Sequence, residues 1–308
     1  MKKIFIALAA LATIAACNKA EVIETQENDA ISFNTPFVDN ATKAAQAAHD
    51  PSYGAQLFTQ FNVWGTANGV AIFAGEKVTG EVGQGKVWHC EKKQYWVNGV
   101  DYNFAAVANG EVTPGDDDKL PATISYTANG TSDLIYAENK GIKGKPAGSN
   151  SPVALTFSHL LAKVKFTATT NTDIEGYSYT VSDITINNAY DSGVYTIEDE
   201  SWDSLVKTNG KSFGSITVNK DVKKNECAQE MLLIPISATE KVSISCKMTL
   251  NYGGNAIWEE TASVTVDTGL LAANAYNFTI GLNVGEEITF SVEKNAAWSE
   301  DNNQTIYF

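Results

Sequence analysis

Arginine is missing from this sequence, and all 22 basic residues are lysines. Without a guanidinium group, the chain has no side chain for bidentate recognition of a carboxylate or a phosphate. Lysine is itself outnumbered, because 36 acidic residues give a formal net charge of −14. An acidic chain without basic clusters lacks the cations that contact nucleic acid phosphates. We therefore expect no nucleic acid partner.

Histidine and cysteine are also scarce, with three and four residues. The histidines lie outside any HExxH pattern, and there is no CxxC pair, nucleophile-elbow GxSxG or glycine-rich phosphate loop. His159 follows an apolar stretch and is interpreted as structural, and the acidic run at 116–118 lacks the spacing of a calcium loop. We expect no enzyme, no cofactor and no metal site. Whether Cys227 and Cys246 pair is left open.

A long apolar run occurs only at the N-terminus, where residues 4–12 follow two lysines. The run is too short to span a bilayer and has the character of a signal peptide. Ile-Ala-Ala-Cys at 14–17 resembles the lipobox of bacterial lipoproteins. This resemblance implies that residues 1–16 are a removable lipoprotein signal peptide, that Cys17 carries lipid, and that Asn18 directs the protein to the outer membrane. A plain secretory signal is the alternative.

Beyond the signal peptide, the pattern predicts β-strands. Residues 17–30 are polar and acidic and are predicted to form a flexible tether. From Ile31 onward, apolar residues alternate with period two, and Asn-Gly pairs separate the runs. A stretch rich in Pro, Gly and Ser at 145–152 indicates a domain break. We predict an all-β chain with sandwich domains at 31–148 and 149–283 and an extension at 284–308.

Several stretches, taken in order, are similar to the fimbrillin family, the subunits of type V pili. They are ISFNTPFVDNATKA (31–44), FNVWGT (61–66), YW (95–96), YNFAA (102–106), DLIYA (133–137), VALTFSHLLAKV (153–164), LLIP (232–235) and YNFTI (276–280). The resemblance covers nearly the whole chain. It implies two tandem transthyretin-like β-sandwiches, a cell-surface fimbrium and adhesion.

The family resemblance also implies assembly by strand exchange. A protease would cut between Lys43 and Ala44 and release the first strand, whose apolar residues are Ile31, Phe33 and Phe37. The resulting open sheet edge would accept a strand with apolar residues at the same two-residue step. The C-terminal tail offers these at Ile288, Phe290 and Val292. The implied partners are other copies or related subunits joined head to tail, membrane lipid, and the processing protease.

Two alternatives remain open at this stage. The family is usually cut after arginine, so either a lysine-tolerant protease acts at Lys43 or the strand stays and the protein is an anchor or terminal subunit. A different class of function is a surface glycan-binding lipoprotein that uses aromatic platforms. Its candidate residues are Trp88, Tyr95, Trp96 and Trp202. The sequence leaves any host receptor and the position along a pilus undecided.

Overall fold

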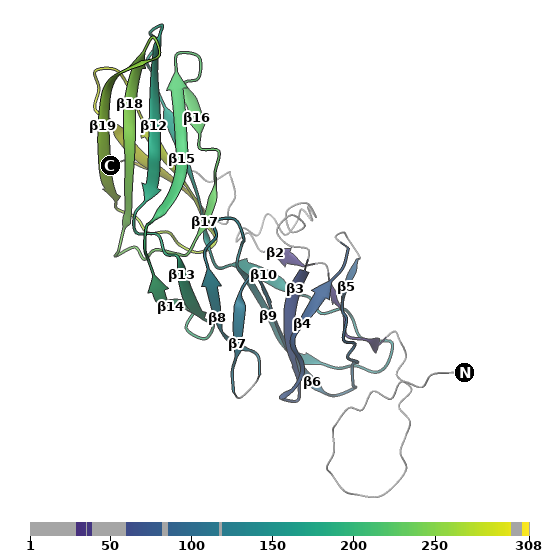
Figure 1. The fold of residues 1–308 in the computed structure, drawn as a ribbon. Helices are drawn as coiled ribbons and strands as arrows, with labels where there is room; N and C mark the ends of the chain where they lie inside the picture. The colour runs from purple at the N-terminus through teal and green to yellow at the C-terminus, as the bar shows by residue number, and fades with distance from the viewer. Residues whose placement is uncertain are drawn as a thin grey trace, which may run out of the picture.

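A computed structural model describes residues 29–34, 36–38, 60–81, 86–116, 119–296 and 304–307. Over these residues the chain is all-β, as the alternation predicted, and forms an elongated molecule of two stacked parts (Figure 1). In this described part, no helix has both the length and the apolar character needed to cross a bilayer.

The N-terminal part is built on an eight-stranded sheet in the order β1-β5-β4-β3-β6-β9-β10-β2. Its hairpins form where the sequence places turn residues. Asn68 and Gly69, for example, have φ of 48° and 77° between β3 and β4, as a tight hairpin turn requires. The strands are β1 (Phe33–Asn34), β2 (Phe37–Val38), β3 (Gln60–Ala67), β4 (Val70–Thr79), β5 (Val87–Cys90), β6 (Asp101–Ala108), β9 (Ile135–Lys143) and β10 (Thr156–His159).

Strand β6 is buried on both faces, which places a second layer against this sheet. Tyr102, Phe104 and Ala106 join one apolar cluster, confined to residues 31–157. Ala105 and Val107 join a second cluster, which continues into the C-terminal part. The second layer is a four-stranded sheet, ordered β14-β13-β8-β7. Its strands are β7 (Glu111–Pro114), β8 (Pro121–Thr127), β13 (Ser192–Thr196) and β14 (Ser201–Val206).

This four-stranded sheet draws on both sides of the domain break predicted at residues 148 and 149. Strand β13 pairs antiparallel with β8, with Val194 opposite Ser125. The chain therefore crosses back from its second half to complete a sheet of its first half. The division at 148 and the transthyretin-like arrangement of two tandem domains stay predictions.

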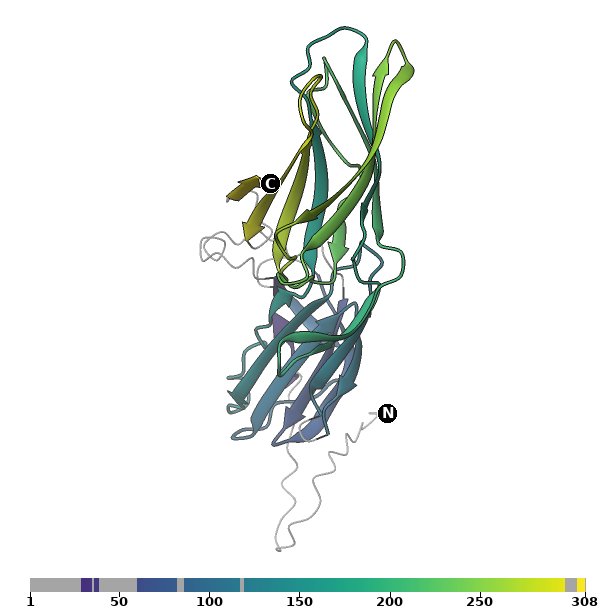
Figure 2. The ribbon, with the colours of Figure 1, turned by 90° about the vertical axis from the view of Figure 1, so that its left-hand side faces the viewer.

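The C-terminal part is a sandwich of two sheets (Figure 2). One has the order β16-β11-β20-β21-β22, with β17 also paired to β11, and the other has the order β15-β12-β18-β19. Phe166 lies between the layers, 5.2 Å from the ring of Phe278 and 4.8 Å from that of Phe213. The strands are β11 (Ala162–Thr169), β12 (Tyr177–Ile186), β15 (Lys211–Asn219), β16 (Lys224–Glu226), β17 (Met231–Leu233), β18 (Val242–Tyr252), β19 (Asn255–Val266), β20 (Asn274–Gly281), β21 (Thr289–Ala296) and β22 (Gln304–Tyr307).

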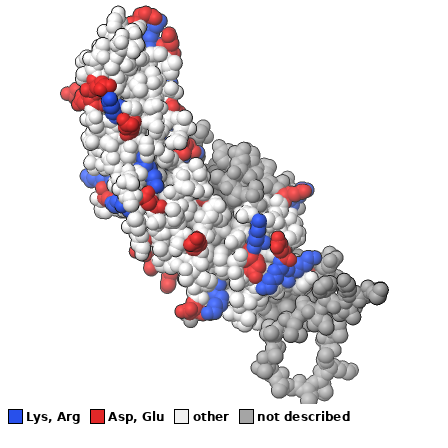
Figure 3. Space-filling model, viewed as in Figure 1, with Lys and Arg blue, Asp and Glu red and all other residues white. Residues whose placement is uncertain are grey.

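Charged residues of both signs are interspersed on the face drawn in Figure 3. Surface lysines pair with acidic residues, as in Lys207–Glu240 and Lys247–Glu259. The cysteines that the structure describes are all free thiols, so Cys227 and Cys246 are not bonded to each other.

Candidate functional site

The first segment of the described chain lies between two edges of the N-terminal sheet. On one side Phe33 pairs with Trp88 and Asn34 with Val87, so β1 lies antiparallel to β5. On the other side the Val153 amide donates to Ser32 O (2.7 Å), and the Asn34 amide donates to Val153 O (2.9 Å). The segment thus carries backbone hydrogen bonds on both of its flanks.

The same segment stands at both ends of the eight-stranded order. Strand β1 is the first member beside β5, and β2 is the last member, parallel to β10, with Phe37 opposite Thr156. Because β1 and β2 are consecutive in the chain, this one segment closes the sheet on itself. Its removal would expose two strand edges at once.

Side chains of the first segment fill the core beneath it. Phe33 is fully buried, with its ring 5.8 Å from that of Phe61 and 5.9 Å from that of Phe104, both edge-on. Ile31 is 3% exposed. Burying side chains of this size contributes about 1.5–3 kcal/mol each. Of Phe37, the third predicted residue, only the backbone pairing is described.

Pairing of the first segment begins before the predicted strand. Asp29 O accepts from the Trp96 amide (3.0 Å), and the Asp29 carboxylate accepts from the Gly148 amide (2.7 Å). The carboxylate therefore fastens the segment to the loop that the sequence analysis interpreted as a domain break. The sequence predicts that Asp29 belongs to the tether, because an isolated acidic residue in a polar run gives no signal of such a contact.

The C-terminal tail pairs with its own chain. Strand β21 lies antiparallel to β20, with Phe290 opposite Ile280 and Val292 opposite Phe278, and β22 continues the sheet. Val292 is buried, whereas Ile288 and Phe290 are only partly buried. The predicted removable strand and donor strand thus belong to different sheets, and the structure does not bring them together.

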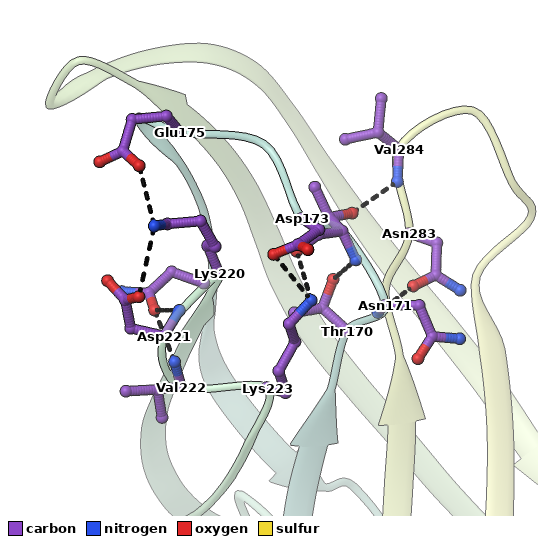
Figure 4. A network of polar contacts seen from close by, with 12 residues as sticks. Thr170, Asn171, Asp173, Glu175, Lys220, Asp221, Val222, Lys223, Asn283 and Val284 are labelled. Atoms are coloured by element: carbon purple, nitrogen blue, oxygen red, sulfur yellow. Dashed lines mark hydrogen bonds and ion pairs between the residues drawn. The ribbon is translucent and has the colours of Figure 1, made fainter.

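A polar network holds the base of the tail (Figure 4). The Asn171 amide donates to Asn283 Oδ1 (2.6 Å), and the Val284 amide donates to Thr172 Oγ1 (3.1 Å). The same loop is held by an ion pair between Lys223 Nζ and Asp173 Oδ1 (3.3 Å). Gly285 follows with φ of 78°, which favours glycine. The stem at 282–284 is therefore held by hydrogen bonds, and Gly285 lies in the turn that follows, which the Glu286 amide closes by donating to Asn283 O (3.3 Å).

The remaining predicted residues divide into three groups. Cys17, Lys43 and Ala44 lie outside the described residues. Trp88 is fully buried, stacked on Phe61 at 5.8 Å, so the prediction that it is an exposed platform is wrong. Tyr95, Trp96 and Trp202 are partly buried. Among the described residues, no three His, Cys, Asp or Glu side chains gather as metal ligands.

Together, the fold and the two terminal segments define an elongated all-β protein in which each terminal strand completes a sheet. A model of the Fimbrillin-like family matches residues 26–308, and the chain belongs to that family. Membership makes it a structural protein of cell-surface fimbriae, which argues against an enzyme. No curated protein matches the chain.

Solved structures have the same fold. A fimbrial protein from Bacteroides vulgatus superposes with a TM-score of 0.59 at 13% identity, covering 88% of this chain and 100% of that one. A candidate cell adhesion protein from Bacteroides ovatus gives 0.55 at 14% identity, covering 88% and 99%. A third, from Bacteroides uniformis, gives 0.53 at 14% identity, covering 88% and 98%. At such identities the likeness concerns the fold alone.

Proposed function

We propose that the chain is a pilus subunit that is exported as a lipoprotein precursor and polymerises by strand exchange. The observation that carries the proposal is the double role of the segment at 29–38, which caps both edges of the N-terminal sheet. A precursor capped in this way has no open edge there to pair prematurely.

Processing is the first step of the proposal. Lys43 follows β2 in the chain, so a cut between Lys43 and Ala44 would separate the whole of β1 and β2 from the body. Lipid on Cys17 would leave with them. The cut would uncover the edge of β5, the edge of 153–157 and the space occupied by Phe33.

Donation of the tail is the second step. In its own sheet the side chain of Phe290 is partly exposed, whereas the site that the Phe33 side chain occupies is fully buried. Transfer of Ile288 and Phe290 from the first environment to the second would remove additional apolar surface from water, which favours the intermolecular pairing, whereas Val292 is already buried in its own sandwich. The fixed stem at 282–284 would keep the donor attached to its subunit while residues after Gly285 move.

Filament growth follows from the geometry of the contact. The donor belongs to the C-terminal sandwich and the acceptor to the N-terminal sheet, so the two surfaces differ. A heterologous contact of this kind leaves a free donor and a free acceptor at the ends, and chains grow head to tail. Attachment of the filament to outer membrane and to host surfaces is part of the same proposal.

The absence of arginine requires a protease that accepts lysine. The test is to isolate high-mass polymers from cells and to sequence the N-terminus of the subunit, with Lys43→Ala as the variant and Lys145→Ala, at an exposed loop lysine, as the control. We expect Ala44 at the N-terminus, loss of polymers in Lys43→Ala and no effect of Lys145→Ala. Polymers composed of subunits that begin at a lipidated Cys17 would overturn the proposal for a shaft subunit.

A further inference from the structure

A hollow of about 750 Å³ lies where the two parts of the molecule meet. One wall is the β13–β14 hairpin, another is formed by β9 and β10, and the loops at 235–237 and 270–272 close the side toward the C-terminal sandwich. Among the described residues, neither the segment at 29–38 nor the tail lines the hollow. The hollow shares Thr156 with the edge that the proposed cut would uncover, but its aromatic wall and its other linings lie away from that edge.

Aromatic rings dominate the hairpin wall of this junction hollow. The rings of Tyr195 and Trp202 are 5.5 Å apart at an interplanar angle of 60°, and Tyr136 of β9 also lines the hollow. Aromatic faces of this kind pack against the apolar C–H faces of a ring-shaped ligand.

The polar groups of the junction hollow are hydroxyls and carboxylates. Thr156, Ser158 and Ser237 contribute hydroxyls to the lining. Glu138 lies at the rim, where it accepts from Tyr136 Oη (2.8 Å) and pairs with Lys140 (2.8 Å). In the described part of the chain, the carboxylate of the other rim residue, Glu200, has no hydrogen bond and no ion pair. Burial, and then the nearby charge of Glu200, raises the pKa of Tyr195.

The backbone at Glu200 adopts an uncommon conformation. Its φ is 48°, a left-handed value that favours Gly or Asn over a longer side chain. Residues held in such a conformation cost stability and cluster at binding sites. A glutamate here, in a hairpin turn beside the hollow, places an unpaired acceptor at the rim.

Size and charge narrow the class of ligand. An apolar ligand would leave the carboxylates and hydroxyls desolvated and unpaired. A single ammonium group is far smaller than 750 Å³, whereas this volume is in the range of sites for ligands of several rings. The Glu200 carboxylate would repel an anionic ligand, whereas the charge of Glu138 is balanced by Lys140.

We propose that the junction hollow binds a neutral oligosaccharide, stacked on Tyr195 and Trp202 and hydrogen-bonded to Glu200. The ligand is a short chain of uncharged sugars, whose hydroxyls match the acceptors and whose C–H faces match the rings. The site would give each subunit an adhesive function of its own, independent of polymerisation.

The test is binding of the full-length monomeric chain to immobilised oligosaccharides, followed by calorimetric titration of the best binder. The panel contains neutral hexose and N-acetylhexosamine oligomers, sialylated and sulfated glycans, and a lysine-rich peptide as a cationic probe. The decisive variant is Glu200→Asn, because asparagine suits a φ of 48° and the variant should fold at least as well as the wild type. Glu198→Asn, in the same turn but outside the hollow, is the matched control.

We expect a neutral oligomer to bind, Glu200→Asn to weaken its binding about tenfold, as loss of a hydrogen bond to a charged group does, and Glu198→Asn to leave it unchanged. Tyr195→Ala should abolish binding, with circular dichroism reporting the fold. The proposal is overturned if no neutral glycan binds, if the anionic or cationic probe binds instead, or if Glu200→Asn binds like the wild type. None of these outcomes bears on strand exchange, which is measured by polymer formation.

Discussion

At the scale of single residues, Asp133 and His159 join two stretches that carry the family resemblance. His159 Nδ1 lies 2.6 Å from Asp133 Oδ2, with both side chains almost fully buried. Burial raises the pKa of the Asp133 carboxyl, and the hydrogen bond with His159 opposes that shift. The structural interpretation of His159 is confirmed, but its partner was not predicted. Sequence patterns cannot pair two polar residues that strands bring together from a distance.

Breaking this pair should cost stability. Asp133→Asn keeps the shape of the side chain but removes the charge that faces His159, and loss of one partner of a buried pair costs about 3–5 kcal/mol. We expect the free energy of unfolding, measured by urea denaturation, to fall by about 3 kcal/mol. Asp267→Asn breaks an exposed pair with Lys241 and should change it by less than about 1 kcal/mol. Equal effects of the two substitutions would contradict this account.

Tyr126 should make stability fall in alkaline solution. Its hydroxyl donates to Ser132 O (2.5 Å), and burial, aided by nearby Asp133, raises its pKa to about 12. Because the folded pKa lies above the ordinary value of 10, the Tyr126 contribution is present below pH 10 and is lost as the pH rises through 12. Tyr126→Phe should lose less stability over this interval than the wild type. Parallel denaturation curves for the two proteins at each pH would speak against it.

At the scale of elements, local sequence patterns predict where a strand lies in the chain, but they do not predict which other strand it pairs with. The alternation at 276–282 predicted β20, and the Asn-Gly pair at 68–69 predicted the β3–β4 hairpin. Both predictions rest on neighbours in sequence. The parallel pairing of β11 with β20 and the two-sided pairing of Phe33 depend on long-range contacts. The sequence predicts the two-residue spacing of the apolar residues in the first strand. It does not predict that β5 and the segment at Val153 are the two partners of that strand.

The first segment should contribute strongly to the stability of the precursor. Phe33→Ala would leave a cavity among Phe61, Phe73 and Phe104, and such truncations cost about 3–5 kcal/mol. We expect a loss of this size in chemical denaturation of the uncleaved chain. Val70→Ala, at a side chain that is 55% exposed, is the control and should have little effect. If both variants unfold alike, Phe33 does not hold the segment in place.

The base of the tail should control how often the tail opens. Asn283→Ala removes the acceptor of the Asn171 amide and the contact with Glu286 (2.7 Å). We expect faster hydrogen exchange in β21 while β18 keeps its protection, because the fixed stem no longer limits the motion. Asn255→Ala, at the exposed first residue of β19, should leave exchange in β21 unchanged. Unaltered exchange in Asn283→Ala would show that β20 alone retains the tail.

At the scale of the whole molecule, the family and the all-β class were within reach of the sequence, whereas the joining of the two parts was not. The β13–β14 hairpin lies past the predicted break but completes a sheet with β7 and β8. The composition at 145–152 indicates a loop, but it does not show which strands after the loop pair with strands before it. The junction hollow is formed by this crossing, which the sequence does not reveal. Of the aromatic residues that line the hollow, only Trp202 was among the residues predicted from the sequence as aromatic platforms.

Assembly is the property that belongs to the whole molecule. Replacing Ile288 and Phe290 together with serine removes the apolar face of the tail, and high-mass polymers should disappear on denaturant-free gels. Thr289→Ala with Ser291→Ala changes the same strand on its other face and should leave polymers intact. Polymers that survive loss of both apolar residues would exclude the tail as donor.

Closure of the N-terminal sheet has a consequence for how the chain folds. Phe33 reaches its native pairing only when both Trp88 and Val153 have been synthesised and folded. The segment around Phe33 is made early, so it stays unpaired until the ribosome has reached the middle of the chain. Contacts of such high sequence separation slow folding, because the entropy of closing a long loop is lost before the contact forms. A nascent chain would therefore carry an unsatisfied apolar segment throughout the synthesis of its first half.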